Sequence, residues 1–245
     1  MDIDQILNKG TQTLSQPFLS GCLILVDKPL EWTSFDVVNK IRFAIKHKFG
    51  VKKCKVGHAG TLDPLATGLL LICTGLYTKK IDSLQNESKV YSGTIKLGAT
   101  TPTYDAESIP VDFKVVPEIN AELLKKVEQN FFGTQNQKPP IYSAIKMKGQ
   151  KSYDLARRGI EVEMKERPIT IHDISLTHKT NELLQFSIHC SKGTYIRSLA
   201  HDIGAYLGCG GYLLSLRRDS ISQYDVNDAL SIDEVISNIQ SIPSS

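Results

Sequence analysis

A single carboxylate lies within the glycine-rich segment GHAGTLDPLATG, residues 57–68. Asp63 immediately precedes Pro64, and the residue before a proline is disfavoured in the helical conformation. Glycines on both sides of Asp63 allow a positive φ or a close backbone approach. We therefore expect a constrained loop that aims the Asp63 side chain. From these features alone, a turn carboxylate is favoured over a catalytic one.

The spacing around Asp63 argues against several common catalytic sites. His58 lies five residues before Asp63, which is not the i, i+4 spacing of a helical metal pair, and the chain has no H-E-x-x-H or C-x-x-C motif. The G-x-S-x-G turn of a serine hydrolase is missing, and the segment lacks the lysine and hydroxyl of a Walker A loop. We therefore expect no metal site.

Three other side chains have ordinary structural explanations when each is considered by itself. His58 would most often be a loop histidine, and Tyr91 a core aromatic on the apolar face of its strand. Arg197 would be an arginine at a helix start, although a buried arginine needs a carboxylate partner. No single one of these residues identifies a function.

A run of basic residues precedes the glycine-rich segment. Seven basic residues and no acidic residue lie between Lys40 and Lys55. Such a run is often only a solvated helix face. Because it leads directly into the glycine-rich segment, we favour a surface that contacts the phosphates of a nucleic acid.

The composition is that of a globular protein. Of 245 residues, 41% are hydrophobic and 22% charged, which argues against global disorder, and the net charge of +3 does not by itself indicate nucleic-acid binding. The five cysteines are scattered, so we expect reduced thiols in a cytoplasm. The first residues lack the apolar core of a secretory signal, and the longest apolar run, Leu69–Cys73, is too short to span a bilayer. We expect a soluble, cytoplasmic protein.

Hydrophobic periodicity predicts the elements that must position these residues. Residues 1–20 are polar and weakly patterned, and we expect a loosely attached extension. A buried strand is predicted at 22–29, and Thr33 to Asp36 resembles a capping box that starts an amphipathic helix. Leu69–Cys73 fits a buried strand or a helix start, and residues 89–99 alternate as a strand.

The second half of the chain also mixes helices and strands. A helix is predicted at 118–131, a loop leading to a short helix at 137–159, and a strand at 184–190 that stops before Gly193. A helical stripe follows at 196–207, and a final strand at 213–222. Strands of mixed spacing interrupted by helices favour an α+β domain around an antiparallel or mixed sheet.

Several motifs occur along the chain in the same order as in one known family. They are VDKP (26–29) with TSFD (33–36), GHAGTLDPLATGLLLICTG (57–75), KVY (89–91), QKPPIYSAIKMKGQKSYDLARRG (137–159), KGTYIRSLAHDIG (192–204) and LRR (216–218). Over residues 21–230 the chain resembles the bacterial TruB-type tRNA pseudouridine synthases, which modify uridine 55. The resemblance implies the α+β catalytic fold of that family, a mixed and largely antiparallel sheet flanked by helices and loops.

The resemblance also assigns roles to matching residues. Asp63 matches the catalytic aspartate of the family, and His58 matches a histidine that contacts the RNA beside the flipped nucleotide. Tyr91 matches the tyrosine that stacks on the target base. Tyr195 matches a second tyrosine that contacts the substrate, and Leu216 a leucine that lines the uracil pocket.

Two further matches would support these residues. Arg197 matches the arginine that pairs with the catalytic carboxylate, and an arginine beside Asp63 would keep that carboxylate ionised. Lys79, in the sequence TKK, matches a lysine near the active site.

The reaction that the resemblance implies suits these residue types. Conversion of uridine to pseudouridine breaks the N1–C1′ bond and forms a C5–C1′ bond without a redox change, so no cofactor is required. One carboxylate either attacks C1′ or removes the C2′ proton, and the sequence leaves both routes open. Stacking on Tyr91 would assist extrusion of the base. Phosphate contacts would come from Lys40–Lys55, residues 137–159 and Arg217–Arg218.

The resemblance further predicts a division of the chain and its partners. We expect an N-terminal extension over 1–20, a catalytic domain over 21–232 and a short C-terminal tail over 233–245, without a full RNA-binding domain of the PUA type. Guide-RNA-dependent relatives share the D-P-L-A-T-G-type run but rely on that domain. We therefore expect a monomer that acts on the T-arm of tRNA, with no guide RNA and no membrane.

Two other functions remain open from the sequence. The first is an RNA-binding or RNA-folding protein in which catalysis is secondary. The second is a carboxylate-dependent hydrolase of nucleosides or nucleotides, which would release free uracil.

Overall fold

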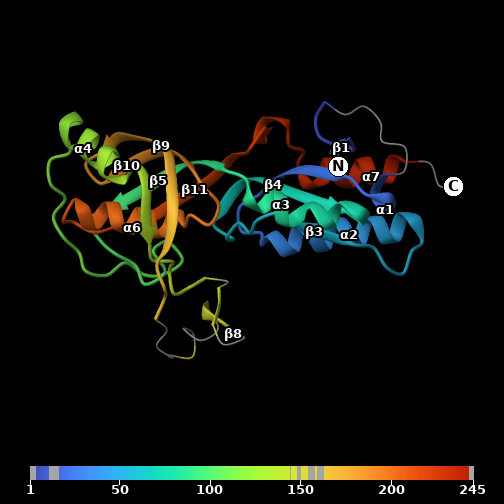
Figure 1. The fold of residues 1–245 in the computed structure, drawn as a ribbon, viewed down its shortest axis with the longest axis horizontal. Helices are drawn as coiled ribbons and strands as arrows, with labels where there is room; N and C mark the ends of the chain where they lie inside the picture. Colours follow the sequence, from blue (N-terminus) through green and yellow to red (C-terminus); the bar gives the residue numbers. More distant parts are fainter. Residues whose placement is uncertain are drawn as a thin grey trace. The chain divides into compact units, whose positions relative to one another are not determined.

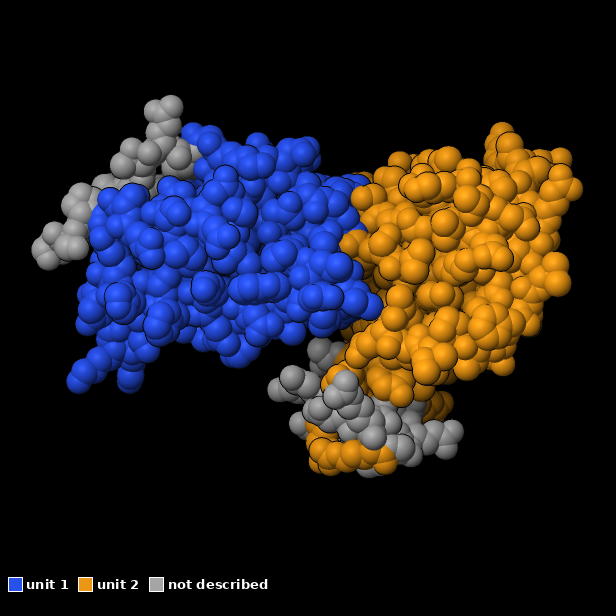
Figure 2. All heavy atoms as spheres, turned by 180° about the vertical axis from the view of Figure 1, so that it is seen from behind, with its two compact units in different colours: residues 1–90, 217–245 blue, residues 91–216 orange. Residues whose placement is uncertain are grey.

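The chain divides into two compact units, coloured blue and orange in Figure 2. Unit 1 comprises residues 1–90 and 217–245, and unit 2 comprises residues 91–216. Strands β5 (Lys89–Leu97) and β11 (Gly211–Ile221) each have residues in both units. The computed structural model describes residues 4–10, 17–143, 145–147, 150–153, 158 and 163–242.

Unit 1 is built around a mixed sheet. Besides its parts of β5 and β11, its elements are β1 (Ile6–Leu7), α1 (Pro17–Ser20), β2 (Leu23–Lys28), α2 (Ser34–Phe49), β3 (Val56–His58), β4 (Ala66–Thr74), η1 (Gly75–Lys80), α3 (Ile81–Asn86), β12 (Tyr224–Asp225), η2 (Val226–Asp228) and α7 (Ile232–Ser241). The strand order is β1-β2-β4-β11 (Figure 1). β1 runs parallel to β2, whereas β2 and β3 both pair antiparallel with β4.

Both faces of this sheet are buried, which explains why β4 is an almost unbroken apolar run. β2 and β4 pair with Ile24 opposite Ile72 and Leu25 opposite Leu71. Ile24 and Ile72 contribute to a core that includes residues of α2 and α7. Leu25 and Leu71 contribute to a second core, which includes a residue of α3. Because successive residues of a strand point to opposite faces, each face has its own core.

Helix α2 starts and ends at residues that its sequence marks. The Thr33 hydroxyl accepts a hydrogen bond from the Asp36 backbone, and the Asp36 carboxylate accepts one from the Thr33 backbone. The predicted capping box is therefore confirmed. Val37 and Ile41 lie on the buried face of the helix. Gly50 follows the last turn with a φ of 62°, a left-handed conformation that glycine adopts without strain.

Unit 2 contains the second set of strands. Its remaining elements are α4 (Ala121–Phe131), β6 (Gly133–Gln137), β7 (Lys146–Met147), β8 (Gln150–Lys151), β9 (Arg167–Thr180), β10 (Leu183–Cys190) and α6 (Ile196–Tyr206). The strand order is β11-β5-β10-β9-β6, and β7 pairs with β8 separately. β9 and β10 form a long antiparallel pair in which buried Phe186 lies opposite buried Leu176. The Glu128 carboxylate of α4 accepts a hydrogen bond from the Leu176 backbone (2.7 Å), which ties α4 to β9.

The predicted fold class is confirmed, because mixed strands alternate with helices. The predicted strands at 22–29, 89–99, 184–190 and 213–222 correspond to β2, β5, β10 and β11. The segment Leu69–Cys73, for which a strand or a helix start was possible, belongs to strand β4. The predicted helices at 118–131 and 196–207 correspond to α4 and α6. Strands β6 and β9 have no counterpart among the predicted elements.

The segment 137–159 lies only partly within the described residues. A loop followed by a short helix was predicted over 137–159, and residues 144, 148–149, 154–157 and 159 of that segment lie outside the described residues. In the described part, β7 and β8 pair antiparallel. The Ser152 hydroxyl donates to the Ser143 carbonyl (2.9 Å), and both side chains are buried.

The N-terminal residues are more firmly packed than the sequence suggests. Ile6 and Leu7 pair with Leu23 and Ile24 of β2, and Leu7 is only 2% exposed. Phe18 of α1 is 1% exposed and belongs to the same core. For the described residues, the expectation of a loosely attached extension is therefore wrong. Leu7 and Phe18 anchor this short polar segment in the core, and its sparse apolar residues did not form a pattern that predicts their burial.

The C-terminal residues also form a regular element. A short tail was expected from residue 233, but residues 232–241 form α7. Its start is capped by Ser231, whose hydroxyl accepts a hydrogen bond from the Glu234 backbone. Ile232, Val235 and Ile239 are buried in the core with α2. The domain boundaries at residues 20 and 232 stay a prediction.

Candidate active site

The loop that carries Asp63 joins β3 to β4 in unit 1. The Ala66 backbone donates to the Asp63 carbonyl (3.0 Å), which closes a tight turn. The Ser34 hydroxyl, at the start of α2, accepts a hydrogen bond from the Leu62 N–H (2.8 Å) and donates one to the Leu62 carbonyl (3.1 Å). On the other side, the Pro64 carbonyl accepts from the Glu31 backbone (2.8 Å). The residues on both sides of half-buried Asp63 are therefore held in place.

A buried arginine contacts the same loop. Arg218 of β11 is 1% exposed. Its Nε donates to the Leu69 carbonyl (2.7 Å) and its Nη2 to the Gly60 carbonyl (3.1 Å). The prediction that Arg218 contacts phosphate is therefore wrong, because the guanidinium lies in the interior of unit 1. Arg217 is more exposed and donates two hydrogen bonds to the Asp27 carboxylate (3.1 and 2.8 Å).

A second buried cation lies near the loop. Lys28, at the end of β2, is 0% exposed, and its Nζ donates to the carbonyls of Pro29 (2.9 Å) and Trp32 (2.6 Å). Burial lowers the pKa of Lys28 to about 8, the negative charge of Asp63 acts against this shift, and the positive charge of Arg218 adds to it. Lys28 therefore lies within electrostatic reach of Asp63.

His58 ends β3 and is half-buried. Burial lowers the pKa of its imidazole, and the positive charge of Arg218 lowers it further. A pKa below the ordinary value of 6.5 leaves His58 largely neutral at pH 7. A neutral imidazole both donates and accepts hydrogen bonds but does not attract phosphate by charge.

Lys79 lies in η1, within unit 1, and is exposed. The adjacent Lys80 lies over the Tyr77 ring, with its Nζ 4.2 Å from the ring centroid. Of the seven residues proposed from sequence, unit 1 therefore contains three, namely His58, Asp63 and Lys79.

Tyr91 and Leu216 are the first and last residues of unit 2. Tyr91 lies on β5 and is 9% exposed, whereas Leu216 lies on β11 and is half-buried. β5 and β11 are neighbours in the strand order, so these two residues come from adjacent strands.

Tyr195 precedes α6 and is held through its backbone. The Gln137 side chain accepts from the Tyr195 N–H (2.8 Å) and donates to the Tyr195 carbonyl (3.0 Å). The Arg167 guanidinium lies 4.8 Å from the centroid of the Tyr195 ring. Such a cation–π contact limits the orientations that the ring adopts.

Arg197 is the second residue of α6 and has a carboxylate partner that sequence reasoning missed. Its Nε lies 3.6 Å from the Asp105 carboxylate, and both side chains are about nine-tenths buried. Its other nitrogens donate to the carbonyls of Thr103 (3.1 Å) and Tyr142 (2.9 Å). The general rule that a buried arginine needs a carboxylate called for such a partner but could not locate it. A pairing of Arg197 with Asp63 stays a prediction.

The basic run of α2 and the following loop is largely solvent-facing. Arg42 and Lys48 already donate to protein carbonyls, those of Val56 (2.8 Å) and Gln240 (2.8 Å). The exposed lysines of the run are Lys40, Lys46, Lys52, Lys53 and Lys55.

No metal or membrane feature occurs in the described part of the chain. Within it, no three His, Cys, Asp or Glu side chains are grouped so as to hold a metal ion. No helix there is both long and apolar enough to cross a membrane.

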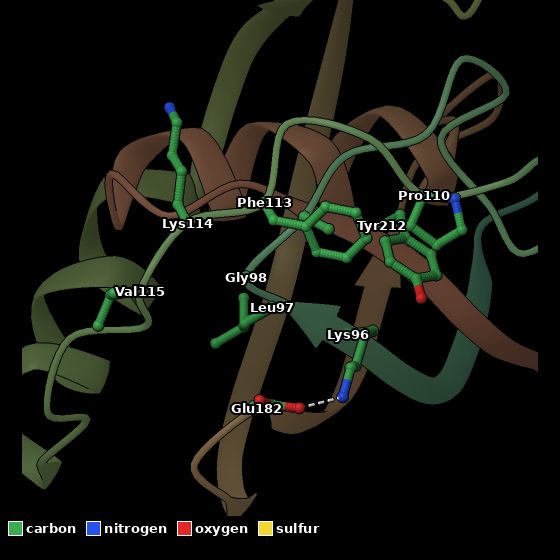
Figure 3. A pocket seen from close by; sticks show the side chains of 10 residues that line it. Lys96, Leu97, Gly98, Pro110, Phe113, Lys114, Val115, Glu182 and Tyr212 are labelled. Carbon is green, nitrogen blue, oxygen red and sulfur yellow. Dashed lines mark hydrogen bonds and ion pairs between the residues drawn. The ribbon is translucent and has the colours of Figure 1, made fainter.

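A cavity of about 470 Å³ lies in unit 2 (Figure 3). The rings of Phe113 and Tyr212 border it, together with the ion pair between Lys96 and Glu182. None of the seven predicted site residues lines this cavity. It therefore gives no support to a catalytic site at that position.

Comparison with known proteins identifies related sequences. The family model described as TruB family pseudouridylate synthase (N-terminal domain) matches residues 46–196, and that of the tRNA pseudouridylate synthase B C-terminal domain matches residues 197–241. The tRNA pseudouridine synthase B of Flavobacterium johnsoniae is 48% identical over 218 residues, which cover 89% of this chain and 95% of that protein. The protein of the same name from Chlorobaculum tepidum is 49% identical over 220 residues, covering 89% of this chain and 91% of that protein.

Solved structures share the fold at lower identity. A crystal structure of a Cbf5–Nop10–Gar1 complex contains a chain with a TM-score of 0.69 and 23% identity. The match covers 96% of this chain and 59% of that chain, so the present chain spans well under two thirds of the solved one. At this identity the likeness shows the fold alone.

Proposed function

Because the chain belongs to the TruB family of pseudouridylate synthases, we propose that it converts uridine 55 in the T-loop of tRNA to pseudouridine. As a member of this family the chain is an isomerase. The observation that carries the proposal for the site is the loop at Asp63, where the Leu62 backbone is hydrogen-bonded to the Ser34 hydroxyl and the Pro64 carbonyl to the Glu31 backbone. Such fastening is what a reaction with a single carboxylate requires.

Asp63 is the proposed catalytic group. The N1–C1′ bond of the uridine breaks, the base turns over, and a C5–C1′ bond forms, after which the proton on C5 is lost to give pseudouridine. Asp63 starts this sequence by attack on C1′ or by removal of the C2′ proton. Neither route changes the oxidation state of the substrate, so we propose that no cofactor takes part.

Four residues are proposed to hold the extruded nucleotide. Tyr91 stacks on the base, Tyr195 makes a second substrate contact, and Leu216 lines the uracil pocket. His58 contacts the RNA beside the flipped nucleotide. The lowered pKa of His58 supports a role for it as a neutral hydrogen-bonding group, not as a cation.

Two basic residues are proposed to support the carboxylate and the RNA. Arg197 is proposed to pair with Asp63, and its contact with Asp105 limits the movement of the Arg197 side chain. Exposed Lys79 lies near the active site and contacts the RNA backbone there.

The T-arm of tRNA is the proposed partner. The curated relatives are named for tRNA, and the exposed lysines of the Lys40–Lys55 run suit a phosphate backbone. We propose a monomer that acts in the cytoplasm without a guide RNA. Its catalytic domain is proposed to span residues 21–232, between an extension over 1–20 and a C-terminal segment over 233–245.

Substitution of Asp63 tests the proposal. Asp63→Asn is expected to abolish pseudouridine formation on a tRNA transcript while tRNA affinity stays within about threefold, because the amide keeps the size of the side chain but neither attacks C1′ nor accepts a proton. Asp82→Asn, at an exposed carboxylate of α3, is the matched control and should keep wild-type activity. A wild-type rate for Asp63→Asn would refute the assignment, and release of free uracil by the wild-type protein would indicate a hydrolase.

A further inference from the structure

Arg218 joins the two ends of the segment that carries Asp63. Its guanidinium is almost completely buried, and it donates to the carbonyl of Gly60 on one side of Asp63 and to that of Leu69 on the other. Arginine presents its donors in a rigid planar fork, so it holds two carbonyls at a fixed separation. A lysine at the same position would present a single nitrogen on a flexible stem.

The backbone of Arg218 constrains the same segment. Gly68 has a φ of 102°, in the left-handed region that favours glycine. A β-carbon at Gly68 would lie 2.3 Å from the Arg218 carbonyl oxygen and 2.7 Å from its nitrogen. Only glycine therefore allows β11 to approach the end of the loop this closely.

The charge of Arg218 also acts on groups around the loop. Burial is the main cause of the lowered pKa of His58, and the charge of Arg218 lowers that pKa further. Burial is also the main cause of the lowered pKa of Lys28, where the charge of Asp63 opposes the shift and the charge of Arg218 adds to it. A positive charge that acts on both these groups lies close to the proposed reaction centre.

We propose that Arg218 is a positioning residue for the proposed reaction: its guanidinium sets the separation of Gly60 and Leu69 and thereby the place of the Asp63 carboxylate. The role rests on the proposed function, because it requires Asp63 to act on the substrate. It differs from phosphate binding, since the side chain is buried. A displacement of about 1 Å in a reacting group lowers rates by roughly 100-fold, so a relaxed loop should affect turnover strongly.

The test compares Arg218→Lys and Arg218→Met with Thr74→Val. Thr74, on the same strand as Leu69, is fully buried, and its hydroxyl accepts from the Cys22 backbone (3.0 Å), so its substitution perturbs the same sheet away from the loop. Both Arg218 variants are expected to lose about 100-fold in kcat, with tRNA affinity within about threefold of wild type, measured where each variant is fully folded. Thr74→Val should lose stability but keep kcat.

Two readouts distinguish positioning from plain core stability. In Arg218→Ala, millimolar guanidinium should restore part of kcat, whereas methylammonium should not. A merely structural role would give neither rescue by guanidinium nor a kcat loss beyond the unfolded fraction.

The outcomes separate this inference from the proposed function. If Asp63→Asn is inactive but Arg218→Lys turns over at the wild-type rate, the positioning role is wrong and the proposed function stands. If Asp63→Asn forms pseudouridine at the wild-type rate, the catalytic role of Asp63 is wrong, and the positioning role of Arg218 loses its premise. If Arg218→Lys and Arg218→Met are both unfolded, Arg218 serves the core and the inference is overturned.

Discussion

The interior of unit 1 contains buried positive charge. Lys28 and Arg218 have almost no exposed surface, and the nitrogens of both donate to backbone carbonyls. Carbonyl dipoles replace part of the water that a buried cation loses, but the remaining cost appears as the lowered pKa of Lys28. Half-buried Asp63 offsets part of that cost through its charge.

The pKa of Lys28 predicts a pH dependence of stability. Because the folded-state pKa is about 8 and the ordinary value is 10.5, the unfolded chain binds more protons between these values. The contribution of Lys28 to the free energy of unfolding should therefore increase as the pH rises from 8 to about 10. Urea unfolding of the wild type and of Lys28→Met at several pH values measures this dependence. The free energy of unfolding of the wild type should increase relative to that of Lys28→Met as the pH rises. Equal slopes would show that Lys28 has an ordinary pKa.

Tyr91 offers a second prediction at the scale of one residue. Stacking of a base on an aromatic ring is worth about 1–3 kcal/mol, so Tyr91→Ala should reduce single-turnover rates by about 10- to 100-fold. Most of the salt-dependent tRNA affinity should remain, because that term comes from phosphate contacts. At this buried position alanine would also cost roughly 3 kcal/mol of stability through lost packing. Tyr91→Phe keeps the ring and is therefore the control for that loss. Equal losses of turnover and affinity in Tyr91→Ala would make Tyr91 chiefly a core residue.

Local sequence predicted some of these residues and missed others for a physical reason. The glycines and Pro64 around Asp63 indicated a constrained loop, because their backbone preferences are local. The partner of Arg197, Asp105, lies far away in the chain, and no periodicity links the two. Arg218 was assigned to phosphate because its burial depends on the packing of β11, which a single motif does not reveal.

At the scale of elements, the start of α2 connects helix capping to the loop at Asp63. Thr33 caps the helix, and the next residue, Ser34, holds the backbone of Leu62. A change in the first turn of α2 is therefore transmitted to the residue that precedes Asp63.

The capping box of α2 gives an element-scale prediction. Thr33→Ala should lower the free energy of unfolding by about 1 kcal/mol, the usual cost of a lost cap, and should also reduce kcat because Ser34 shifts. Ser231→Ala removes the equivalent capping box of α7 and is the matched control. It should cost similar stability in thermal unfolding without lowering kcat. If both variants keep full kcat, the start of α2 does not position the loop.

Elements with strong local signals were the ones predicted from sequence. The capping box and apolar period of α2, and the alternation of β5 and β10, are local features of the chain. β4 was ambiguous because both faces of its sheet are buried, which removes the alternation that marks a strand. β9 alternates locally, with Ile169 and Ile171 and then Ile174 and Leu176 buried, but a one-residue break between the two pairs interrupts the period.

At the scale of the whole molecule, local charge matters more than the total. The net charge is only +3, yet Lys52, Lys53 and Lys55 follow α2 with their side chains exposed. Association with RNA phosphates releases counterions at each contact, so a compact group of lysines determines the salt dependence of affinity.

Substitution of these lysines tests the proposed RNA surface. Replacement of Lys52, Lys53 and Lys55 by Gln should reduce the slope of log affinity against log salt by up to about 3, at roughly 0.7–0.9 per phosphate contact. The matched control replaces exposed Lys125, Lys126 and Lys179 of unit 2, which changes the net charge equally. An unchanged slope in the first variant would show that these three lysines form an ordinary solvated surface and do not contact RNA.

Unit 1 is assembled from two stretches of chain, and this has a consequence for its biosynthesis. Its core combines β2, β4 and α2 with Val235 and Ile239 of α7, which the ribosome makes only after all of residues 91–216. Arg218, which joins the ends of the Asp63 loop, emerges equally late. β2, β4 and α2 are therefore made without their contacts to α7 and to residues 217–221 of β11 until unit 2 has been translated. The Asp63 loop would be among the last parts of the nascent chain to reach its final shape.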